Sequence, residues 1–464
     1  MIGAASLSKF RAIACLSTAR KILGNIWMRM LPVLVFLSFQ TGFVKGCQAA
    51  GGVYVANRAA EISREWGLKV YAVQIDLKKA FDRVLHSAVL RAVALHGASA
   101  YCIAVMAALL QDGVVRIKLV RVVTEAIPMD RGVPQGAPES PMLFIFVVEN
   151  VLQELQVVWH ARGSGWICEQ MHLTNVCFAD DVILFSSCRE DVTRMLGETV
   201  AAFKTVGLDV GMEKTHWTCW PSEEGITSAA DGVGVAWEPY LTFVGGVLDF
   251  KGNSGNAIDH RIAQAEKTYH KWKPLLTSRW VSQKRRAELA VRAVISSLLW
   301  LSETWTPTKA QTRRLDSWGA RLMARVVGTK RSPMEDVGVY WRRLHRKGHA
   351  CLRTVGGSVA KRRRKRLHRY AGHLARMADG MARAALRTRS LAWWRYRQRR
   401  FVSKHCALHP KRFSALSRWE AQLTATHGEA ETADVELNVG WLALASDRLG
   451  WKGREDAFAN TVDA

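Results

Sequence analysis

The chain has 464 residues, an apolar fraction of 49%, and 66 Lys and Arg against 40 Asp and Glu, which gives a formal net charge of +26. The apolar fraction excludes a wholly disordered protein, and the charge favours a polyanionic partner, either nucleic acid or an anionic membrane surface. The longest apolar run, residues 30–39, is shorter than the roughly 20 residues that span a membrane, so we expect a buried helix or strand there and no membrane partner. The nine cysteines form no C-x-x-C pair, which argues against a disulfide framework and fits a reducing compartment.

Residues 70–76, VYAVQID, are rich in β-branched and aromatic side chains and predict a strand that leads to Asp76. The apolar residues that follow are spaced as on one face of a helix that ends at Gly97. They are Phe81, Val84, Leu85, Ala88 and Ala92.

Residues 131–141, RGVPQGAPESP, combine glycine and proline and predict a loop. Ser140 followed by Pro141 favours a helix start, because serine caps the first turn and proline suits the first helical position. The helix expected from residue 142 to about 159 opens almost wholly apolar, which indicates that it is buried.

Asp180 and Asp181 lie between two apolar runs in CFADDVILFS, residues 177–186, and the pattern predicts a hairpin with both aspartates at its turn. An isolated Asp-Asp pair is more often an ordinary polar turn. A further helix is expected up to Gly207. Together these elements predict an α+β fold, a sheet with helices on one face.

From residue 251 the pattern becomes helical, with tryptophans at 272, 280, 300, 305 and 318. A basic tract follows, in which Arg and aromatic residues alternate, and this predicts stacking and backbone contacts with nucleic acid. Its run KRRRKR, residues 361–366, is also compatible with a nuclear import signal or a solvated helix face. A zinc site is disfavoured, because the candidate ligands lack the usual spacing. These are His345, His349, Cys351 and His368.

If the strand before Asp76 pairs with the hairpin, three carboxylates meet at one edge of a sheet. Such a cluster repels itself unless cations occupy it. Mg²⁺ takes oxygen ligands of this kind and keeps positions open for substrate phosphates. Two such ions about 4 Å apart stabilise the attacking and leaving oxygens of a phosphoryl displacement.

Several segments, in order, resemble the reverse transcriptase of non-LTR (LINE-type) retrotransposons. The resemblance covers roughly residues 10–330, with a weaker match to about residue 377. The matching segments are FRAIACLSTARK, QTGFVKG, IDLKKAFDRV, RGVPQGAPESPMLF, FADD, GLDVGMEKT, YLTFVGGVL and LHRYAGHLARM. The chain departs from the family pattern at Ala137, Glu139 and Gly211, and at FVGG in the box that resembles the primer-gripping hairpin.

The resemblance implies catalytic roles for four residues. Asp76, Asp180 and Asp181 would be the metal ligands for two Mg²⁺ ions, with Mn²⁺ as an alternative. Lys214 would protonate the departing pyrophosphate.

It also implies a nucleotide-binding set. Phe81 would stack under the sugar and exclude a 2′-hydroxyl, and Gln135 with Gly136 would contact the nucleotide. Asp82 is interpreted as a structural carboxylate rather than a ligand. Three basic residues would contact the triphosphate, namely Arg11, Lys21 and Lys45.

The fold implied is a right-hand polymerase, with fingers, a palm that carries an antiparallel sheet with helices, a helical thumb and a basic helical C-terminal extension. We expect partial fingers at 1–69, a palm with the remaining fingers at 70–250, and a thumb at 251–330. A basic nucleic-acid-binding region is expected at 331–410, and residues 411–464 form a tail of unknown role.

The function implied is an RNA-directed DNA polymerase that extends a DNA 3′ end on an RNA template with dNTPs. Two alternatives remain open, a degenerate copy that only binds RNA and a maturase-like splicing cofactor. No endonuclease domain is recognised, so we expect nicking to come from a missing domain or another protein. A ribonucleoprotein of the nucleus or cytoplasm is expected; the acid-poor first 60 residues also fit an organellar transit peptide, which we consider weaker.

Overall fold

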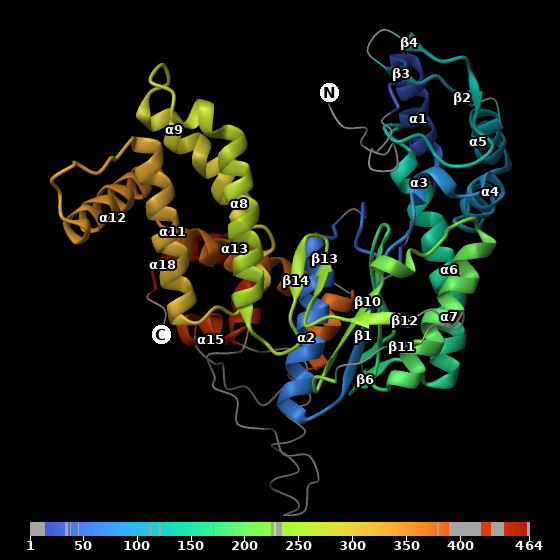
Figure 1. The fold of residues 1–464 in the computed structure, drawn as a ribbon. Helices are drawn as coiled ribbons and strands as arrows, with labels where there is room; N and C mark the ends of the chain where they lie inside the picture. Colours follow the sequence, from blue (N-terminus) through green and yellow to red (C-terminus); the bar gives the residue numbers. More distant parts are fainter. Residues whose placement is uncertain are drawn as a thin grey trace, which may run out of the picture.

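The computed structural model describes most of the chain. The described residues are 14–32, 36–37, 39–44, 46–111, 113–119, 122–169, 171–223, 227–228, 234–377, 380–388, 419–427 and 440–461. Figure 1 shows a central sheet from which two groups of elements rise, one on either side.

A six-stranded sheet of order β11-β12-β10-β1-β9-β8 forms the centre. Its strands are β1 (Val70–Ile75), β8 (Asn175–Phe178), β9 (Asp181–Ser186), β10 (His216–Trp220), β11 (Thr227–Ser228) and β12 (Gly234–Trp237). β1 pairs antiparallel with both β9 and β10, whereas β10 and β12 run parallel. The predicted strand at 70–76 and the predicted hairpin around Asp180 are therefore confirmed.

Helices cover both faces of this sheet. On one face α6 (Ser140–Arg162) and α7 (Arg189–Thr205) share a core with alternate residues of β1, and on the other face α2 (Ala49–Trp66) packs on the remaining residues. Figure 1 shows α2 on the side of the sheet away from α6 and α7. The prediction of helices on one face is wrong, because β1 is apolar at nearly every position and both of its faces need cover.

The single helix expected between Phe81 and Gly97 is in fact two, α3 (Ala80–Arg83) and α4 (His86–Leu95). Contacts with the Gly-rich loop interrupt the helix between Arg83 and His86. The oxygen of Val84 accepts a hydrogen bond from Gly132 N at 2.7 Å, and Leu85 forms an isolated bridge with Arg131. The apolar spacing predicted from the sequence is correct, but it continues across a bend at Val84. Contacts with the Gly-rich loop produce this bend, and the spacing alone does not reveal it.

The buried helix expected from residue 142 is α6, which begins two residues earlier, at Ser140. Glu139 rather than Ser140 occupies the capping position. Among the helices of the described part of the chain, α6 is the one long and apolar enough to cross a membrane by length and composition. Here it lies in the core, where residues 143–148 are all buried.

The group that rises on one side of the sheet comprises helices and short strands before α6 (Figure 1). It contains α1 (Thr18–Met30), α4, α5 (Ala100–Gln111), β2 (Val114–Val115), β3 (Lys118–Leu119), β4 (Val122–Val123) and β5 (Ile127–Pro128). A separate small hairpin, β6 (Trp166–Cys168) with β7 (Met171–Leu173), follows α6.

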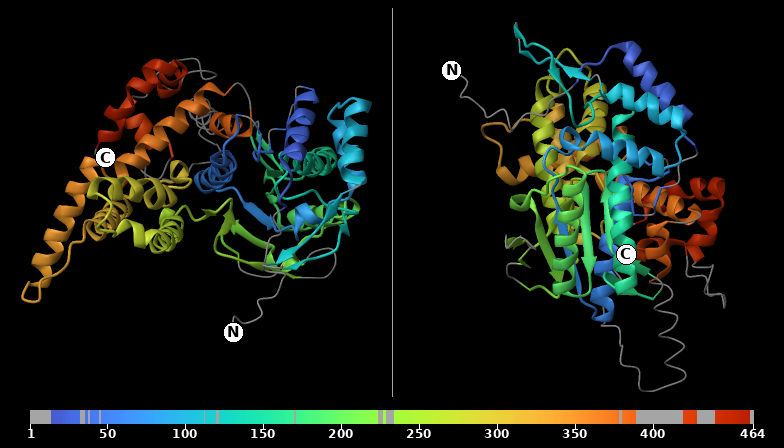
Figure 2. Two further views of the ribbon diagram at one scale, coloured as in Figure 1. Left: turned by 90° about the horizontal axis from the view of Figure 1, so that it is seen from above. Right: turned by 90° about the vertical axis from the view of Figure 1, so that its right-hand side faces the viewer.

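The other group is helical, as predicted for residues beyond 251, and Figure 2 shows it opposite α1 and α5 when the molecule is seen from above. The hairpin of β13 (Leu241–Phe243) and β14 (Gly246–Leu248) leads into it. Its helices are α8 (Ser254–Leu276), α9 (Gln283–Ala290), the π-helical η3 (Val291–Ile295), α10 (Ser296–Leu298), η4 (Ser302–Thr304), α11 (Lys309–Val327), α12 (Val337–Thr354) and α13 (Val359–Arg376).

Parts of the C-terminal tail pack back onto the core. The helices α15 (Ala421–His427), α16 (Gly440–Ser446), α17 (Arg448–Gly453) and α18 (Glu455–Asn460) follow α13. Trp419, Trp441 and Trp451 are buried in the same cluster as α2 and α13. The basic stretch 393–401 lies outside the described residues.

Candidate active site

The ends of β1 and β9 bring two of the predicted carboxylates side by side. In the antiparallel register Ile75 faces Val182, so Asp76, which follows Ile75, lies beside Asp181, which precedes Val182. Asp180 belongs to the turn between β8 and β9, where Phe178 pairs with Asp181. The pairing on which the carboxylate hypothesis depended is therefore present.

A buried glutamine, Gln40, supports the turn that carries the aspartates. Ala179 adopts a left-handed conformation with φ of +56°, which costs a non-glycine residue free energy. Gln40 offsets this, because its Oε1 accepts hydrogen bonds from Ala179 N at 3.2 Å and Gly42 N at 2.8 Å. Sequence reasoning missed this role, since the segment QTGFVKG suggested only a phosphate contact; Gln40 in fact bridges to Cys177 of β8.

Asp76 is linked to the segment that contains Lys214. The Nζ atom of Lys214 lies 3.5 Å from Oδ2 of Asp76, and Gly211 N donates to the Asp76 carbonyl at 2.7 Å. Lys214 stands in the short 3₁₀ helix η2 (Met212–Lys214), with its side chain 67% exposed. A Cβ atom at position 211 would lie 3.0 Å from Oδ2 of Asp76, so the departure from the family pattern at Gly211 fits the close approach here.

The β13–β14 hairpin lies against Asp181. Oδ2 of Asp181 accepts from Val244 N at 3.3 Å, in the hairpin turn. The carbonyl of Val244 in turn accepts from Nε1 of Trp300 at 2.9 Å. Gln74 of β1 pairs through its side-chain amide with the backbone of Thr242, so the hairpin is fixed both to the central strand and to the helical group.

Asp76, Asp180 and Asp181 are the candidate ligands of a metal ion. Within the ranges that the structure describes, no group of three or more His, Cys, Asp or Glu side chains is arranged to hold one. Asp76 and Asp181 nevertheless offer carboxylates from neighbouring strand ends, and Mg²⁺ is commonly held by one or two carboxylates together with substrate phosphates. The pair therefore fits such an ion, and the full ligand set of Asp76, Asp180 and Asp181 stays a prediction.

Phe81 and Gln135 lie together in a second part of the site. The ring of Phe81 stacks on Phe144 of α6, with centroids 4.5 Å apart, and the Phe81 carbonyl accepts from Val133 N at 2.7 Å. Nε2 of Gln135 donates to Oδ1 of Asp82 at 2.9 Å. Asp82 thus holds the side chain of Gln135, and the roles assigned to both residues stay predictions.

Gly136 approaches the N-terminal segment closely. Its φ is +121°, and a Cβ atom there would lie 2.8 Å from the carbonyl oxygen of Ala14. Ala14 N donates to the carbonyl of Gln135 at 2.8 Å. A contact within the protein therefore already requires glycine at this position.

Helix α1 docks on the same loop through an ion pair. Arg20 lies 2.5 Å from Oε1 of Glu139, whose side chain is only 1% exposed, and Gly24 leaves room for the other carboxylate oxygen. This pair accounts for Glu139 at a position where the family has an aliphatic residue. Lys21, next to Arg20, is exposed on α1, whereas Arg11 and Lys45 lie outside the described residues.

Comparison with known proteins identifies the class of protein that carries this site. Residues 3–248, more than half of the chain, match the family described as reverse transcriptase (RNA-dependent DNA polymerase). The chain belongs to the reverse transcriptase family, and its central sheet covered by helices agrees with the α+β right-hand polymerase fold expected from the sequence. Relatives are named as polyproteins of R2 retrotransposable elements, which confirms the resemblance to a non-LTR reverse transcriptase.

One such relative, the Retrovirus-related Pol polyprotein of the type-1 element R2 from Popillia japonica, is 30% identical over 33% of this chain. The match spans a quarter of that polyprotein's length. A putative uncharacterised transposon-derived protein of Caenorhabditis elegans is 26% identical over 60% of this chain and 94% of its own. Among solved structures, telomerase from Candida albicans in complex with a fragment of telomeric RNA aligns with 70% of this chain and 58% of its own at 11% identity and a TM-score of 0.41.

Proposed function

We propose that the chain is an RNA-directed DNA polymerase that extends a DNA 3′ end on an RNA template, with dNTPs as substrates. The observation that carries this proposal is the adjacency of Asp76 and Asp181 at the ends of two central strands. The β13–β14 hairpin beside Asp181 supports it, because a primer end held by that hairpin would lie next to the carboxylates. The partners would be the RNA template, a DNA primer or target, and an endonuclease from elsewhere in a longer protein or from another chain.

Reverse transcriptases generally use divalent metal ions. In this chain Asp76 and Asp181, with Asp180 of the adjacent turn, would hold Mg²⁺, and Mn²⁺ would be accepted by the same oxygens. When bound, the ions would neutralise the charge on the attacking and leaving oxygens.

The chain's own residues would position the substrates. Lys214 places its Nζ 3.5 Å from Asp76, close to where a departing pyrophosphate would need a proton. Phe81, braced by Phe144, would lie under the sugar, and Gln135, oriented by Asp82, would contact the nucleotide. Lys21 on the exposed side of α1 would contribute charge for the triphosphate. Positioning and charge are most of what phosphoryl transfer requires.

The test is primer extension on an RNA template with Mg²⁺ and dNTPs, with the Asp180→Ala, Asp181→Ala double variant beside the original protein. We expect the double variant to lose at least a hundredfold in rate, since removal of the metal-binding oxygens leaves the phosphate charges unbalanced. Asp130→Ala is the matched control, because Asp130 is 81% exposed and lies in the loop before the Gly-rich segment. Equal activity in the double variant and the control would refute the proposal.

One observation favours the alternative of a non-catalytic RNA-binding protein. Among the described residues the carboxylates do not assemble a group of three around one point. If the folded original protein binds RNA with normal affinity but incorporates no nucleotide with Mg²⁺ or Mn²⁺, this alternative replaces the polymerase. A splicing cofactor related to maturases would instead be revealed by accelerated excision of an intron without DNA synthesis. For each of these three functions, we propose that the protein acts within a ribonucleoprotein of the nucleus or cytoplasm.

A further inference from the structure

A groove of about 300 Å³ lies between the π-helical turn η3 and helix α13, outside the candidate active site. Its apolar side comes from η3 and from Leu299, just after α10, and its other side is basic. The lining residues are Val291, Ile295, Ser296, Leu299, Gly356, Arg362, Lys365, Arg366 and Arg369. The four basic residues follow one another at i, i+3, i+4 and i+7, the spacing of a single helix face.

Two of the four cations, Arg362 and Arg366, donate to backbone carbonyls. A guanidinium nitrogen of Arg362 donates to the carbonyl of Val355, while its Nε is buried without a hydrogen-bond partner. Arg366 donates to the carbonyl of Leu299 at 2.8 Å, and Glu303 lies 3.8 Å away. Carbonyls orient a guanidinium without removing its charge, so Arg362 keeps its positive charge in the groove and the charge of Arg366 is offset only by Glu303.

Carboxylates of α18 engage the other two cations, Lys365 and Arg369. Glu455 binds Arg369 through both of its oxygens, at 2.7 and 2.8 Å, and Asp456 lies 2.6 Å from Nζ of Lys365. A bidentate arginine–carboxylate pair has the same geometry as an arginine–phosphate pair. A phosphate that enters the groove would therefore find four cations arranged in line, two of them now held by acidic side chains of the tail.

The contacts of α13 also weigh against the interpretation of KRRRKR, residues 361–366, as a nuclear import signal or a solvated helix face. Arg363 is buried, with one nitrogen 2.6 Å from Oε1 of Gln422, and Nε of Arg364 donates to the carbonyl of Ala459 at 3.0 Å. The run is therefore part of a packed helix rather than a free linear segment. Its faces differ, since Arg363 points into the core while Arg362, Lys365 and Arg366 line the groove.

We propose that this groove binds the sugar–phosphate backbone of a nucleic-acid strand, as a site separate from the active site. The choice of nucleic acid as partner rests on the proposed function, but the binding itself needs neither catalysis nor metal. Each phosphate neutralised by a cation releases counterions, so binding through the groove must weaken as salt rises. RNA, single-stranded DNA and duplex DNA share this chemistry, and their relative affinities identify the natural source.

The test measures the affinity of the full chain for a fluorescent 20-nucleotide RNA at several salt concentrations without Mg²⁺ and dNTPs. Arg362→Gln with Arg366→Gln should weaken binding about 3- to 30-fold at 0.1 M salt. It should also reduce the slope of log K against log[salt] by about 1.4, the value for two phosphate contacts on a single strand. Arg362→Lys with Arg366→Lys should restore most of the slope, which a purely structural role would not predict. Parallel titrations with single-stranded and duplex DNA of the same sequence complete the comparison.

The control carries an equal loss of charge elsewhere, Arg91→Gln with Lys204→Gln, on exposed positions of α4 and α7. An equal loss of affinity in this control, or an unchanged salt slope in the Arg362/Arg366 variant, would overturn the proposal. Glu455→Gln should tighten binding by about 2- to 5-fold, because it releases Arg369 from its carboxylate partner; no tightening would overturn the role of Arg369. Because this binding is measured without Mg²⁺ and dNTPs, a failed polymerase and a failed groove give different results.

Discussion

Glu139 shows how a single departure from a family pattern can be stabilised by one partner. Its side chain is almost fully buried and would be costly as a lone carboxylate, but Arg20 from α1 lies within 2.5 Å of it. Removal of one member of a buried pair leaves the other charge uncompensated, whereas removal of both can be nearly neutral. The pair therefore joins α1 to the start of α6.

We expect Arg20→Leu or Glu139→Leu alone to lower the free energy of unfolding by about 2 kcal/mol, a value reduced for the partial exposure of Arg20. The double variant should recover most of this loss, because neither charge is then stranded. Urea unfolding of the three variants and the original chain gives the coupling energy directly. Additive losses would show that the two residues act independently.

Glu149, buried on α6, makes the stability of the fold depend on pH. Burial raises its pKa to about 7, more than the hydrogen bond from Leu37 N lowers it. An acid with a raised pKa in the folded state costs stability as the pH rises from its unfolded value near 4.5, and the cost is complete above about 7.

Glu149→Gln keeps the acceptor for Leu37 N and removes the ionisable group. It should therefore stabilise the protein by up to about 3 kcal/mol at pH 8.5 and change little at pH 4.5. Denaturant unfolding at the two pH values tests this, with Glu154→Gln, an exposed position on the same helix, as the control. A gain that is equal at both pH values would contradict the assigned protonation.

At the scale of elements, the β13–β14 hairpin connects the carboxylates to the helical group. Its turn touches Asp181 through Val244 N and Trp300 through the Val244 carbonyl. The position of this hairpin therefore depends on residues that lie more than fifty positions further along the chain.

Trp300→Phe removes the indole donor while it keeps an aromatic ring. If the hairpin holds the primer, the KM for primer should rise about 2- to 10-fold, the cost of one hydrogen bond, with the KM for dNTPs unchanged. Steady-state primer extension separates the two constants, and Trp272→Phe on α8, where the ring is 38% exposed, is the control. An equal rise in both KM values would argue against a specific primer contact.

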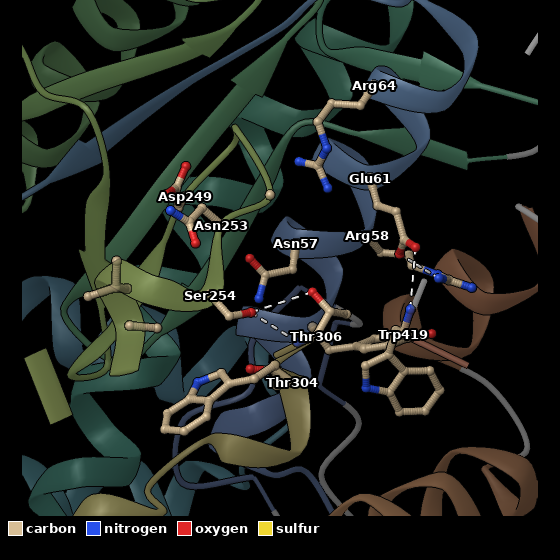
Figure 3. A pocket seen from close by; sticks show the side chains of 15 residues that line it. Asn57, Arg58, Glu61, Arg64, Asp249, Asn253, Ser254, Thr304, Thr306 and Trp419 are labelled. Carbon is tan, nitrogen blue, oxygen red and sulfur yellow. Dashed lines mark hydrogen bonds and ion pairs between the residues drawn. The ribbon is translucent and has the colours of Figure 1, made fainter. Parts of the chain in front are cut away.

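At the scale of the whole molecule, a buried arginine ties α2 to the C-terminal tail. Arg58 is 1% exposed and lies 2.6 Å from Glu61 and 2.7 Å from Glu420. Figure 3 shows it beside the small polar cavity between α2, the start of α8 and the η4 segment, where Trp419 donates to the carbonyl of Glu303. Residues 362 positions apart are thus joined in one polar network.

Arg58→Met should lower the free energy of unfolding by about 3 kcal/mol, because two partly buried carboxylates lose their shared, fully buried cation. A melting curve checks the loss, and limited proteolysis should show earlier cleavage around residue 420 than in the original chain. Arg91→Met, at an exposed position, is the control. A melting temperature that stays the same would mean that the tail is held by its tryptophans alone.

Local sequence by itself determined the strand before Asp76, the hairpin with the two aspartates, and the buried helix after the Gly-rich loop. It also determined the helical character of the chain beyond residue 251. These features could be predicted because apolar spacing and turn residues are local properties. The order of the motifs also indicated the reverse transcriptase family. Tertiary structure alone decided that helices cover both faces of the sheet, that the chain bends at Val84, that Gln40 supports the aspartate turn, and that Arg20 neutralises Glu139. Each of these depends on contacts between residues far apart in the chain, and no periodicity within one segment records which distant surface that segment will meet.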